Sequence, residues 1–313
     1  MRYFLTGGAG FIGSHMTDRL LKDGHQVTVF DNLSNGTESR IAHHLKDRNF
    51  RFIRGDLLKK AELIKAMKGH DFVIHFASNP DIAKALKQPD IDLNLGILTA
   101  FNVLDAMRLN GISKIAFPSG SGVYGDVGDT YTKESFGPLL PISMYGASKL
   151  SVEALICAFC NQYDMQGWIF RFANIIGPRQ THGVTLDFVK KLRANPKELT
   201  ILGDGTQSKS YVYVSEIVDA ILFCISHSKH KVNLFNVASN DFISVNEIAA
   251  IVVKEMGLRK VQLKYTGGKR GWKGDVPVVR LDVTKLNRLG FKVKLSSRDA
   301  VRKTVRDVIG ELS

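Results

Sequence analysis

Cysteine is scarce in this chain, which has three among its 313 residues: Cys157, Cys160 and Cys224. Three cysteines are too few for a disulfide framework, so the sequence is not that of a small disulfide-rich secreted protein, and a reducing cytoplasm is the expected location. Cys157 and Cys160 form a Cys-x-x-Cys pair, but they fall inside an expected helix from Lys149 to Gln162 without a second ligand pair. We therefore interpret the pair as structural rather than as a redox or zinc site.

Long apolar runs are also missing. No stretch reaches the roughly 20 residues that a membrane-spanning helix needs. The first residues lead directly into an apolar strand, without the pattern of a signal peptide. No internal repeat or low-complexity linker interrupts the chain, and 44% hydrophobic residues predict one large or two modest domains.

Acidic residues are outnumbered, 30 against 43 lysines and arginines, so the net charge is +13. Such a charge can indicate nucleic-acid binding, but the basic residues are scattered along surface-type helices and no nucleic-acid motif accompanies them. A general attraction for anions, which would suit a nucleotide substrate, is the simpler interpretation. We expect neither a nucleic-acid nor a membrane partner.

The most informative stretch is the beginning of the chain. An apolar run from Tyr3 predicts a strand, glycines follow at Gly7, Gly10 and Gly13, and Ser14–Lys22 has helical periodicity. A strand, a glycine turn and a helix in this order are typical of dinucleotide binding. The glycines permit a tight turn, a close approach to the pyrophosphate and close helix packing, and the helix N-terminus attracts the anion.

An acidic residue stands where this motif requires one. A second strand, Gln26–Phe30, ends at Asp31, about 20 residues past the glycines, where a carboxylate would bind the ribose hydroxyls. A carboxylate disfavours a phosphate on that ribose, so NAD is predicted rather than NADP. The alternative is a glycine-rich turn in another α/β protein, with Asp31 an ordinary surface residue.

Strands and helices continue to alternate after this point. Further strands are expected at Phe50–Arg54, Phe72–Ser78 and Lys114–Pro118, with helices at Ala61–Met67 and Asp92–Asn110. This alternation predicts a doubly wound parallel α/β sheet of the Rossmann type. The residues expected to bind the cofactor are Gly7, Gly10, Phe11, Ile12, Gly13, Asp31, Asn32, Asp56, Leu57, Ala77, Tyr145 and Lys149.

No metal is expected. His43 and His44 are adjacent on a polar helix predicted from Glu38 to Asp47, and neighbouring residues of a helix point in different directions. His75, within an apolar strand, is interpreted as a packed core residue.

The residues for proton transfer lie near the middle of the chain. Tyr145 and Lys149 are four residues apart on an expected helix and therefore share a face. A lysine ammonium favours the phenolate and should lower the pKa of the tyrosine, which could then take a proton from a sugar hydroxyl. A serine at the end of the fifth strand, Ser119 or Ser121, would complete the set. The alternative is an ordinary surface tyrosine and lysine.

These motifs resemble the extended short-chain dehydrogenase/reductases, and among them the NAD-dependent nucleotide-sugar epimerase/dehydratase family, most closely its UDP-glucose 4-epimerases. The resemblance covers essentially the whole chain. It rests on the glycine turn, Asp31, Asp56, the segment 119–125, the Tyr145-x-x-x-Lys149 motif, and the segments 171–179, 211–214, 235–239 and 274–277.

The resemblance implies NAD-dependent C4 epimerisation of a UDP-hexose, as in galactose metabolism. Oxidation to a 4-keto intermediate would be followed by reduction from the other face. Dehydratases of the family have Thr-Asp-Glu at the positions matching Gly120, Ser121 and Gly122, and decarboxylases usually have a glutamate at the position of Gly122. This chain has neither carboxylate. The chain also departs from the family at Gly120, where relatives have the catalytic serine or threonine, so Ser119 or Ser121 must substitute.

The resemblance also implies substrate contacts in the C-terminal half. Asn174 would bind the phosphate or sugar, Lys209 and Arg270 the diphosphate, and Asp275 the uridine ribose. Val279 stands where many glucose-specific relatives have a tyrosine, and the smaller side chain should leave room for an N-acetyl group.

The expected NAD domain comprises residues 1–173 and about 211–238, and the sugar-nucleotide domain residues 174–210 and 239–313. A homodimer is expected by resemblance. Alternative functions are a UDP-glucuronate epimerase or another nucleotide-sugar oxidoreductase, and a non-catalytic NAD- or nucleic-acid-binding member of the family.

Overall fold

The computed structural model describes residues 1–312 and divides them into two compact units. The first unit comprises Met1–Val123, Met144–Arg171 and Ile221–Phe235, and the second comprises Tyr124–Ser143, Phe172–Ala220 and the described residues from Asn236 on. Residues 124–143 fall in the second unit, where β6 (Tyr131–Thr132) pairs in parallel with β15 (Arg280–Leu281). The assignment of cofactor and substrate binding to separate domains stays a prediction.

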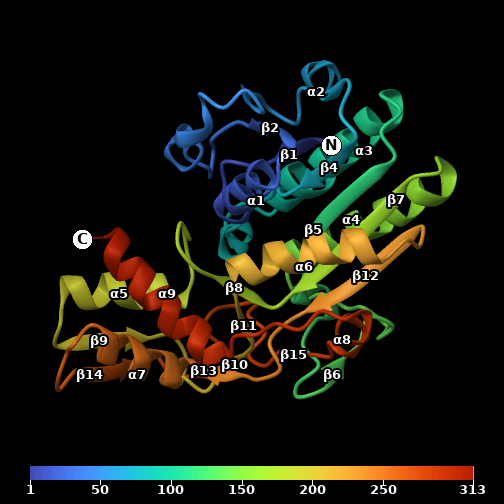
Figure 1. The fold of residues 1–313 in the computed structure, drawn as a ribbon. Coiled ribbons are helices and arrows are strands. Elements are labelled where there is room, and N and C mark those ends of the chain that lie inside the picture. Colours follow the sequence, from blue (N-terminus) through green and yellow to red (C-terminus); the bar gives the residue numbers. More distant parts are fainter. Residues whose placement is uncertain (313) are drawn as a thin grey trace. The chain divides into compact units, whose positions relative to one another are not determined.

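The first unit is built on a seven-stranded sheet with the order β12-β7-β5-β4-β1-β2-β3 (Figure 1). Neighbouring strands from β5 to β3 run parallel, and Leu5 of β1 lies opposite both Val29 and Ile74. The doubly wound parallel sheet expected from the sequence is confirmed. The strands are β1 (Arg2–Thr6), β2 (Gln26–Asp31), β3 (Phe50–Arg54), β4 (Phe72–His75), β5 (Lys114–Gly120), β7 (Gln166–Phe172) and β12 (Val232–Val237).

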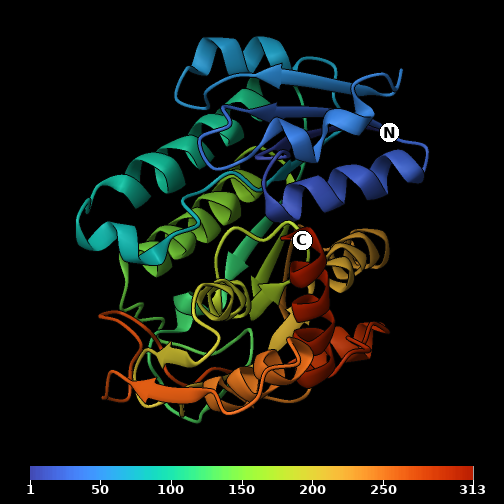
Figure 2. The same ribbon diagram turned by 90° about the vertical axis from the view of Figure 1, so that its left-hand side faces the viewer.

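Helices cover both faces of this sheet. In Figure 2, α1 lies on one side of the strands and α3 and α4 lie on the other. One hydrophobic core fills the space under α2, α3 and α4, where Phe4, Val73 and Phe117 from the strands meet Val103 and Ile156 from the helices. The helices are α1 (Phe11–Lys22), α2 (Lys60–Met67), α3 (Thr99–Leu109) and α4 (Met144–Gln162). Because both faces are covered, residues 3–6 of β1 and all four residues of β4 are buried without a break.

Two expected helices differ from the structure. Residues 38–47 form two short 3-10 turns, η1 (Glu38–Arg40) and η2 (Ala42–His44), in place of one helix. The helix expected from Asp92 starts as a π-helical segment, η4 (Leu93–Leu98), and continues as α3. Gly96 lies within η4, and a Cβ there would come 3.0 Å from the Ser148 hydroxyl, so the glycine permits close packing on α4.

The second unit has short paired strands and a group of helices. The parallel pairs are β8 (Asn174–Ile176) with β11 (Tyr211–Tyr213), β9 (Glu198–Ile201) with β14 (Gln262–Tyr265), and β6 with β15; β10 (Ser208–Lys209) pairs antiparallel with β13 (Ile243–Ser244). Helices α5 (Val184–Ala194), α7 (Val245–Glu255) and α9 (Ser297–Glu311) pack on one another (Figure 1). The remaining helices are α8 (Thr284–Leu289) and α6 (Val214–His227), which runs across the boundary of the units.

Among residues 1–312, no helix is both long and apolar enough to span a bilayer.

Candidate active site and dinucleotide-binding turn

Two glycines in the turn after β1 cannot be replaced without a clash. Gly7 has φ +68°, and a Cβ there would lie 2.7 Å from the backbone nitrogen of Ala77. A Cβ at Gly13 would lie 2.2 Å from the carbonyl oxygen of Gly7. The turn therefore has the tight packing that a dinucleotide fingerprint requires, for the reasons that the sequence predicts.

The N-terminus of α1 is available for an anion. Gly10 is the N-cap residue, it has no side chain to cap the helix, and a Cβ built on it meets only the Gly7 carbonyl, at 3.1 Å. The first backbone N–H groups of α1, from Phe11, Ile12 and Gly13, therefore have no capping side chain. Together with the helix dipole they fit the pyrophosphate of NAD.

The carboxylate of Asp31 is held beside this turn. Its Oδ2 accepts a hydrogen bond from Ala9 N at 3.0 Å, and its Oδ1 accepts one from Leu33 N at 2.8 Å. Asp31 is buried, and the burial raises the pKa of its carboxyl. Each oxygen keeps a lone pair, so the carboxylate can still accept from ribose hydroxyls.

The other predicted cofactor residues lie in turns after the strands. Asn32 accepts from Ser34 N at 3.0 Å, and Asp56 accepts from Leu58 N at 2.9 Å. Leu57 is buried, and Ala77 follows β4 beside the glycine turn. Their contacts with a nucleotide stay a prediction.

Tyr145 and Lys149 share one face of α4, as their spacing predicts. The ammonium of Lys149 donates to Pro118 O at 2.9 Å and lies 3.4 Å from Ser78 Oγ. The same nitrogen lies 5.4 Å from the centre of the Tyr145 ring and 4.8 Å from that of Phe117. The lysine is therefore anchored at the carboxyl ends of β4 and β5 with its charge directed at the tyrosine.

The titration of this pair differs from the expectation. Burial lowers the pKa of Lys149 to about 8, and burial together with the charge of Asp92 raises the pKa of Tyr145 to about 12. The expected lowering of the tyrosine pKa by the lysine is thus outweighed by desolvation of the phenolate. Tyr145 keeps part of its surface exposed, so solvent moderates this rise.

Asp92 is an electrostatic neighbour that sequence reasoning missed. Its Oδ1 accepts from Asn79 Nδ2 at 3.0 Å, whereas its Oδ2 is buried without a hydrogen-bond partner among the described residues. The carboxyl has a raised pKa, chiefly because of burial, and its negative charge raises the pKa values of Lys149 and Tyr145. A single aspartate at the start of a helix gives no signal of this role in the sequence.

The two candidate serines occupy different surroundings. Ser119 is buried in β5, and its hydroxyl donates to Glu153 Oε1 at 2.5 Å. The carboxylate of Glu153 in turn accepts from the guanidinium of Arg171, with Nη2 at 2.7 Å. Glu153 follows Lys149 by four residues, as Lys149 follows Tyr145. This spacing could have indicated that the glutamate lies on the same face of α4.

Ser121 begins the next turn, η5 (Ser121–Tyr124), and is partly exposed. A Cβ built on Gly122 would lie 3.6 Å from Cα of Gly146, so this turn lies beside the first turn of α4, next to Tyr145. A Cβ built on Gly120 meets no atom within 4 Å. The chain therefore has space for a side chain at position 120 and a partly exposed hydroxyl one residue later.

In the second unit, three of the predicted substrate residues contact one another. The ammonium of Lys209 lies 2.7 Å from Asp275 Oδ1, and both side chains are largely buried. Arg270 donates to Asp275 O at 3.1 Å and forms an ion pair with Asp126 at 2.6 Å. Gly271 N donates to the second carboxylate oxygen of Asp275 at 3.1 Å, which fixes this carboxylate beside the Lys209 ammonium.

Asn174 and Val279 are both held by backbone hydrogen bonds to the segment 208–210. Asn174 starts β8 opposite Tyr211 of β11, and its backbone N–H donates to Ser210 O at 3.2 Å, next to Lys209. Val279 precedes β15, and its N–H donates to Ser208 O at 3.3 Å. Both side chains are partly exposed, so each can meet a ligand.

The expectation that His43 and His44 point in different directions is wrong. Because residues 42–44 form a tight 3-10 turn rather than part of a longer helix, both imidazoles reach the same carboxylate, that of Asp18 on α1. Cys157 is partly buried and Cys160 is buried, and burial raises the pKa values of both thiols.

A parallel doubly wound sheet, a glycine turn at a helix N-terminus and a Tyr-Lys pair at the strand ends define the class of the extended short-chain dehydrogenase/reductases. Within that class, residues 3–238 match the model of the NAD dependent epimerase/dehydratase family. The chain belongs to this family, which confirms the resemblance seen in its motifs and the predicted NAD cofactor.

Individual relatives agree with this assignment. A putative UDP-glucose 4-epimerase of Methanocaldococcus jannaschii is 31% identical over 306 residues, covering 96% of each chain. The crystal structure of a UDP-galactose 4-epimerase has a TM-score of 0.89 at 36% identity, with 100% of both chains covered. That of the UDP-glucose 4-epimerase of Thermotoga maritima, with UDP-glucose, has a TM-score of 0.90 at 31% identity over 100% of both chains.

Proposed function

We propose that the protein catalyses the NAD-dependent interconversion of the C4 epimers of a UDP-hexose, either UDP-glucose and UDP-galactose or their N-acetyl forms. Bound NAD would supply the group that accepts a hydride from C4 of the sugar and returns it. The chain itself would hold the nucleotide sugar and move the proton of the C4 hydroxyl, which makes the sugar a 4-ketone in between.

The position of Lys149 is the observation that carries this proposal. Its ammonium is fixed by Pro118 O and lies against the ring of Tyr145, so the positive charge is close to the place where the phenolate forms. A phenolate at Tyr145 would take the hydroxyl proton in the oxidation and return it in the reduction. The backbone anchor keeps the lysine in place through both half-reactions.

The residues before Val123 favour epimerisation over elimination. Positions 121 and 122 are Ser and Gly, where a dehydratase would need a carboxylate pair and a decarboxylase a glutamate at 122 to remove a proton or protonate a leaving group. Epimerisation requires only that the C4 hydrogen and the proton of the C4 hydroxyl are removed and returned. Tyr145 and Lys149 suffice to transfer the hydroxyl proton.

We assign the third catalytic hydroxyl to Ser121 rather than Ser119. The Ser119 hydroxyl is committed to Glu153, whose carboxylate also binds Arg171. Ser121 lies beside the start of α4, as the packing of Gly122 on Gly146 indicates. Its hydroxyl is suited to donate to the C4 oxygen next to Tyr145.

The second unit would bind the UDP portion. Lys209 and Arg270 provide positive charge for the diphosphate, and the fixed carboxylate of Asp275 would accept from the uridine ribose. Asn174 would contact the phosphate or sugar. A homodimer and a cytoplasmic location are part of the same proposal.

Product analysis tests this proposal. Purified protein is incubated separately with UDP-galactose, UDP-N-acetylgalactosamine and UDP-glucuronate, with and without added NAD, and products are separated by chromatography. A C4 epimer from one of the first two, absent with Tyr145→Phe, is expected. Epimer from UDP-glucuronate alone would indicate a glucuronate epimerase, and no product from any sugar despite NAD binding would favour a non-catalytic role.

A further inference from the structure

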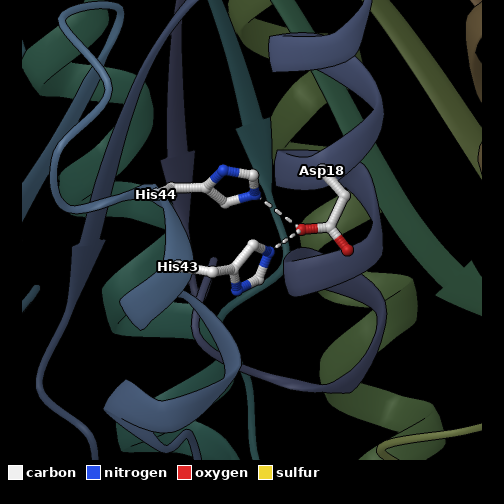
Figure 3. A group of neighbouring side chains, drawn as sticks. All are labelled: Asp18, His43 and His44. Atoms are coloured by element: carbon white, nitrogen blue, oxygen red, sulfur yellow. Dashed lines mark hydrogen bonds and ion pairs between the residues drawn. The ribbon is translucent and has the colours of Figure 1, made fainter.

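A cluster of three potential metal ligands lies on the first unit, outside the residues assigned to catalysis. Asp18 belongs to α1, and His43 and His44 end the turn η2. The Nε2 atom of His43 lies 3.0 Å from Asp18 Oδ1, and that of His44 lies 2.7 Å from the same oxygen. Figure 3 shows both imidazoles directed at this one carboxylate.

The donor set matches the preferences of transition metals. Two imidazole nitrogens and one carboxylate oxygen lie within 4.8 Å of one another. Zinc binds such atoms at about 2.0–2.2 Å in tetrahedral sites, which places ligand atoms roughly 3.3 Å apart. The two Nε2–Oδ1 distances therefore need to open by only about half an ångström for an ion to enter, an adjustment that side-chain rotation provides.

The ligands are held in position before any ion binds. Ile41, fully buried, anchors the turn, and the backbone N–H of His44 donates to its carbonyl at 3.0 Å. The His44 ring packs on Phe50, with 5.6 Å between ring centres, and the two histidine rings lie 3.9 Å apart. Asp18 is placed by α1, whose opposite face is buried through Met16 and Leu20. Such preorganisation reduces the entropy lost on binding.

The solvent exposure of the cluster suits a site with an open position. The side chain of His43 is 50% exposed, that of Asp18 30% and that of His44 16%. One side of the three ligand atoms thus faces solvent, where a water molecule can occupy the fourth coordination position. A single carboxylate makes the cluster a poor site for Ca²⁺ or Mg²⁺, which take mostly oxygen ligands.

We propose that Asp18, His43 and His44 form a binding site for one divalent transition-metal ion of the zinc type. Each imidazole would coordinate the ion through Nε2 and keep its ring proton on Nδ1, and a second ring proton, where a histidine carries one, would pass to solvent. It would join α1, which begins at the glycine turn, to the segment that follows Asp31.

Cobalt(II) is the direct probe of this site. The full-length protein is freed of metal by dialysis against a chelator and titrated with Co²⁺, with visible absorption recorded, and Zn²⁺ is then added in competition. We expect one ion per chain, intense visible bands of a tetrahedral N/O site without a thiolate charge-transfer band, and their loss when Zn²⁺ displaces Co²⁺.

Single variants assign the ion to the cluster. His43→Ala, His44→Ala and Asp18→Asn should each weaken Zn²⁺ binding at least about tenfold in calorimetry. Zn²⁺ should raise the thermal unfolding midpoint of the parent protein and not of these variants. The matched controls are His230→Ala, which removes an exposed histidine elsewhere, and Asp23→Asn, which removes another carboxylate next to α1; both should bind as the parent does.

Other outcomes would overturn the proposal. Unchanged Zn²⁺ affinity in all three variants, or no binding by the parent protein at millimolar Zn²⁺, would show that the cluster is only a hydrogen-bonded surface contact. A thiolate charge-transfer band in the Co²⁺ spectrum would place the ion at the cysteines instead. Circular dichroism on each variant separates a lost ligand from a lost fold.

Discussion

The hydroxyl of Ser119 donates to Oε1 of Glu153, 34 residues further along the chain, and so faces a buried ion pair. This relationship separates two serines that the sequence leaves equivalent. We predict that Ser121→Ala lowers kcat by about 10²-fold, because a hydrogen-bond donor to the reacting oxygen is lost. Ser119→Ala should cost about 1 kcal/mol of unfolding free energy with a far smaller effect on kcat.

Steady-state kinetics and urea unfolding of the two alanine variants measure these effects side by side. The reverse result, with kcat lost in Ser119→Ala and retained in Ser121→Ala, would assign the catalytic hydroxyl to Ser119.

The open space at Gly120 allows a rescue experiment. A Cβ at this position meets no atom within 4 Å, so Gly120→Ser should fold with unchanged stability. The resemblance implies that the family's catalytic hydroxyl stands at this position, so adding Gly120→Ser to Ser121→Ala should restore most of the lost kcat. The matched control is Gly120→Ala in the same background, which fills the space without a hydroxyl. Equal rates in the serine and alanine double variants would refute the rescue.

The Tyr145–Lys149 pair predicts how the rate depends on pH. The fully protonated pair is a phenol beside an ammonium. Loss of one proton gives either the reactive phenolate–ammonium form or the neutral phenol–amine form. These two forms have the same number of protons, so they become populated over the same pH range. Because the pKa of Lys149 is lowered to about 8, the pair loses this proton as the pH rises through about 8. We expect kcat to rise about tenfold per pH unit below that value and to level off above it.

Two variants should move this pH profile in opposite directions. In Lys149→Met the phenol must ionise without an ammonium beside it, so the rise should shift upward, toward the pKa of about 12 of Tyr145. In Asp92→Asn a negative charge that raises both pKa values is removed, so the rise should shift to lower pH. Initial rates between pH 6 and 10 measure both shifts, and a shift of the two variants in the same direction would contradict this account.

Glu153 and Arg171 should matter for stability. Their ion pair is buried, with side-chain exposures of 6% and 4%. Glu153→Gln leaves the guanidinium without its carboxylate and should lower the unfolding free energy by about 3 kcal/mol or more. The double variant Glu153→Gln/Arg171→Met should recover part of that loss in urea titrations. A loss below about 1 kcal/mol in Glu153→Gln would mean that solvent or another group compensates the charge.

Val279 should set the tolerance for an N-acetyl group. Its side chain is partly exposed, and a valine leaves more space than the tyrosine of glucose-specific relatives. We expect Val279→Tyr to reduce kcat/KM for UDP-N-acetylglucosamine much more than kcat/KM for UDP-glucose. Val279→Ala should leave kcat/KM for each of the two sugars nearly unchanged. Equal losses on both sugars, or no turnover of the N-acetyl sugar by the parent protein, would remove this role from Val279.

Local motifs predicted the first unit well, because its signals are short-range. The glycine spacing, the apolar strands and the position of Asp31 can each be recognised in a short stretch of sequence, and the structure realises them in β1, α1 and β2. The Tyr145–Lys149 face follows from helix geometry in the same way.

Contacts between distant segments could not be predicted in this way. The direction of Ser119 depends on Glu153, the charge environment of Lys149 depends on Asp92, and the convergence of His43 and His44 depends on Asp18 in another element. The 3-10 turns at 38–44 escaped prediction because polar residues at helical spacing do not distinguish one long helix from two short turns. The predicted direction of the pKa shift of Tyr145 was wrong for a similar reason, because residue spacing does not show how deeply a side chain is buried.

The most direct test of the central claim follows a deuterium label at C4 of the sugar. Oxidation and re-reduction by one bound cofactor removes and returns the same C4 hydrogen, whereas chemistry through solvent protons exchanges it. UDP-galactose deuterated at C4 should therefore give UDP-glucose that retains the C4 deuterium in ordinary water, with no product from Tyr145→Phe. Product that has lost the label to solvent, or a product that has lost water, would contradict the proposed epimerisation.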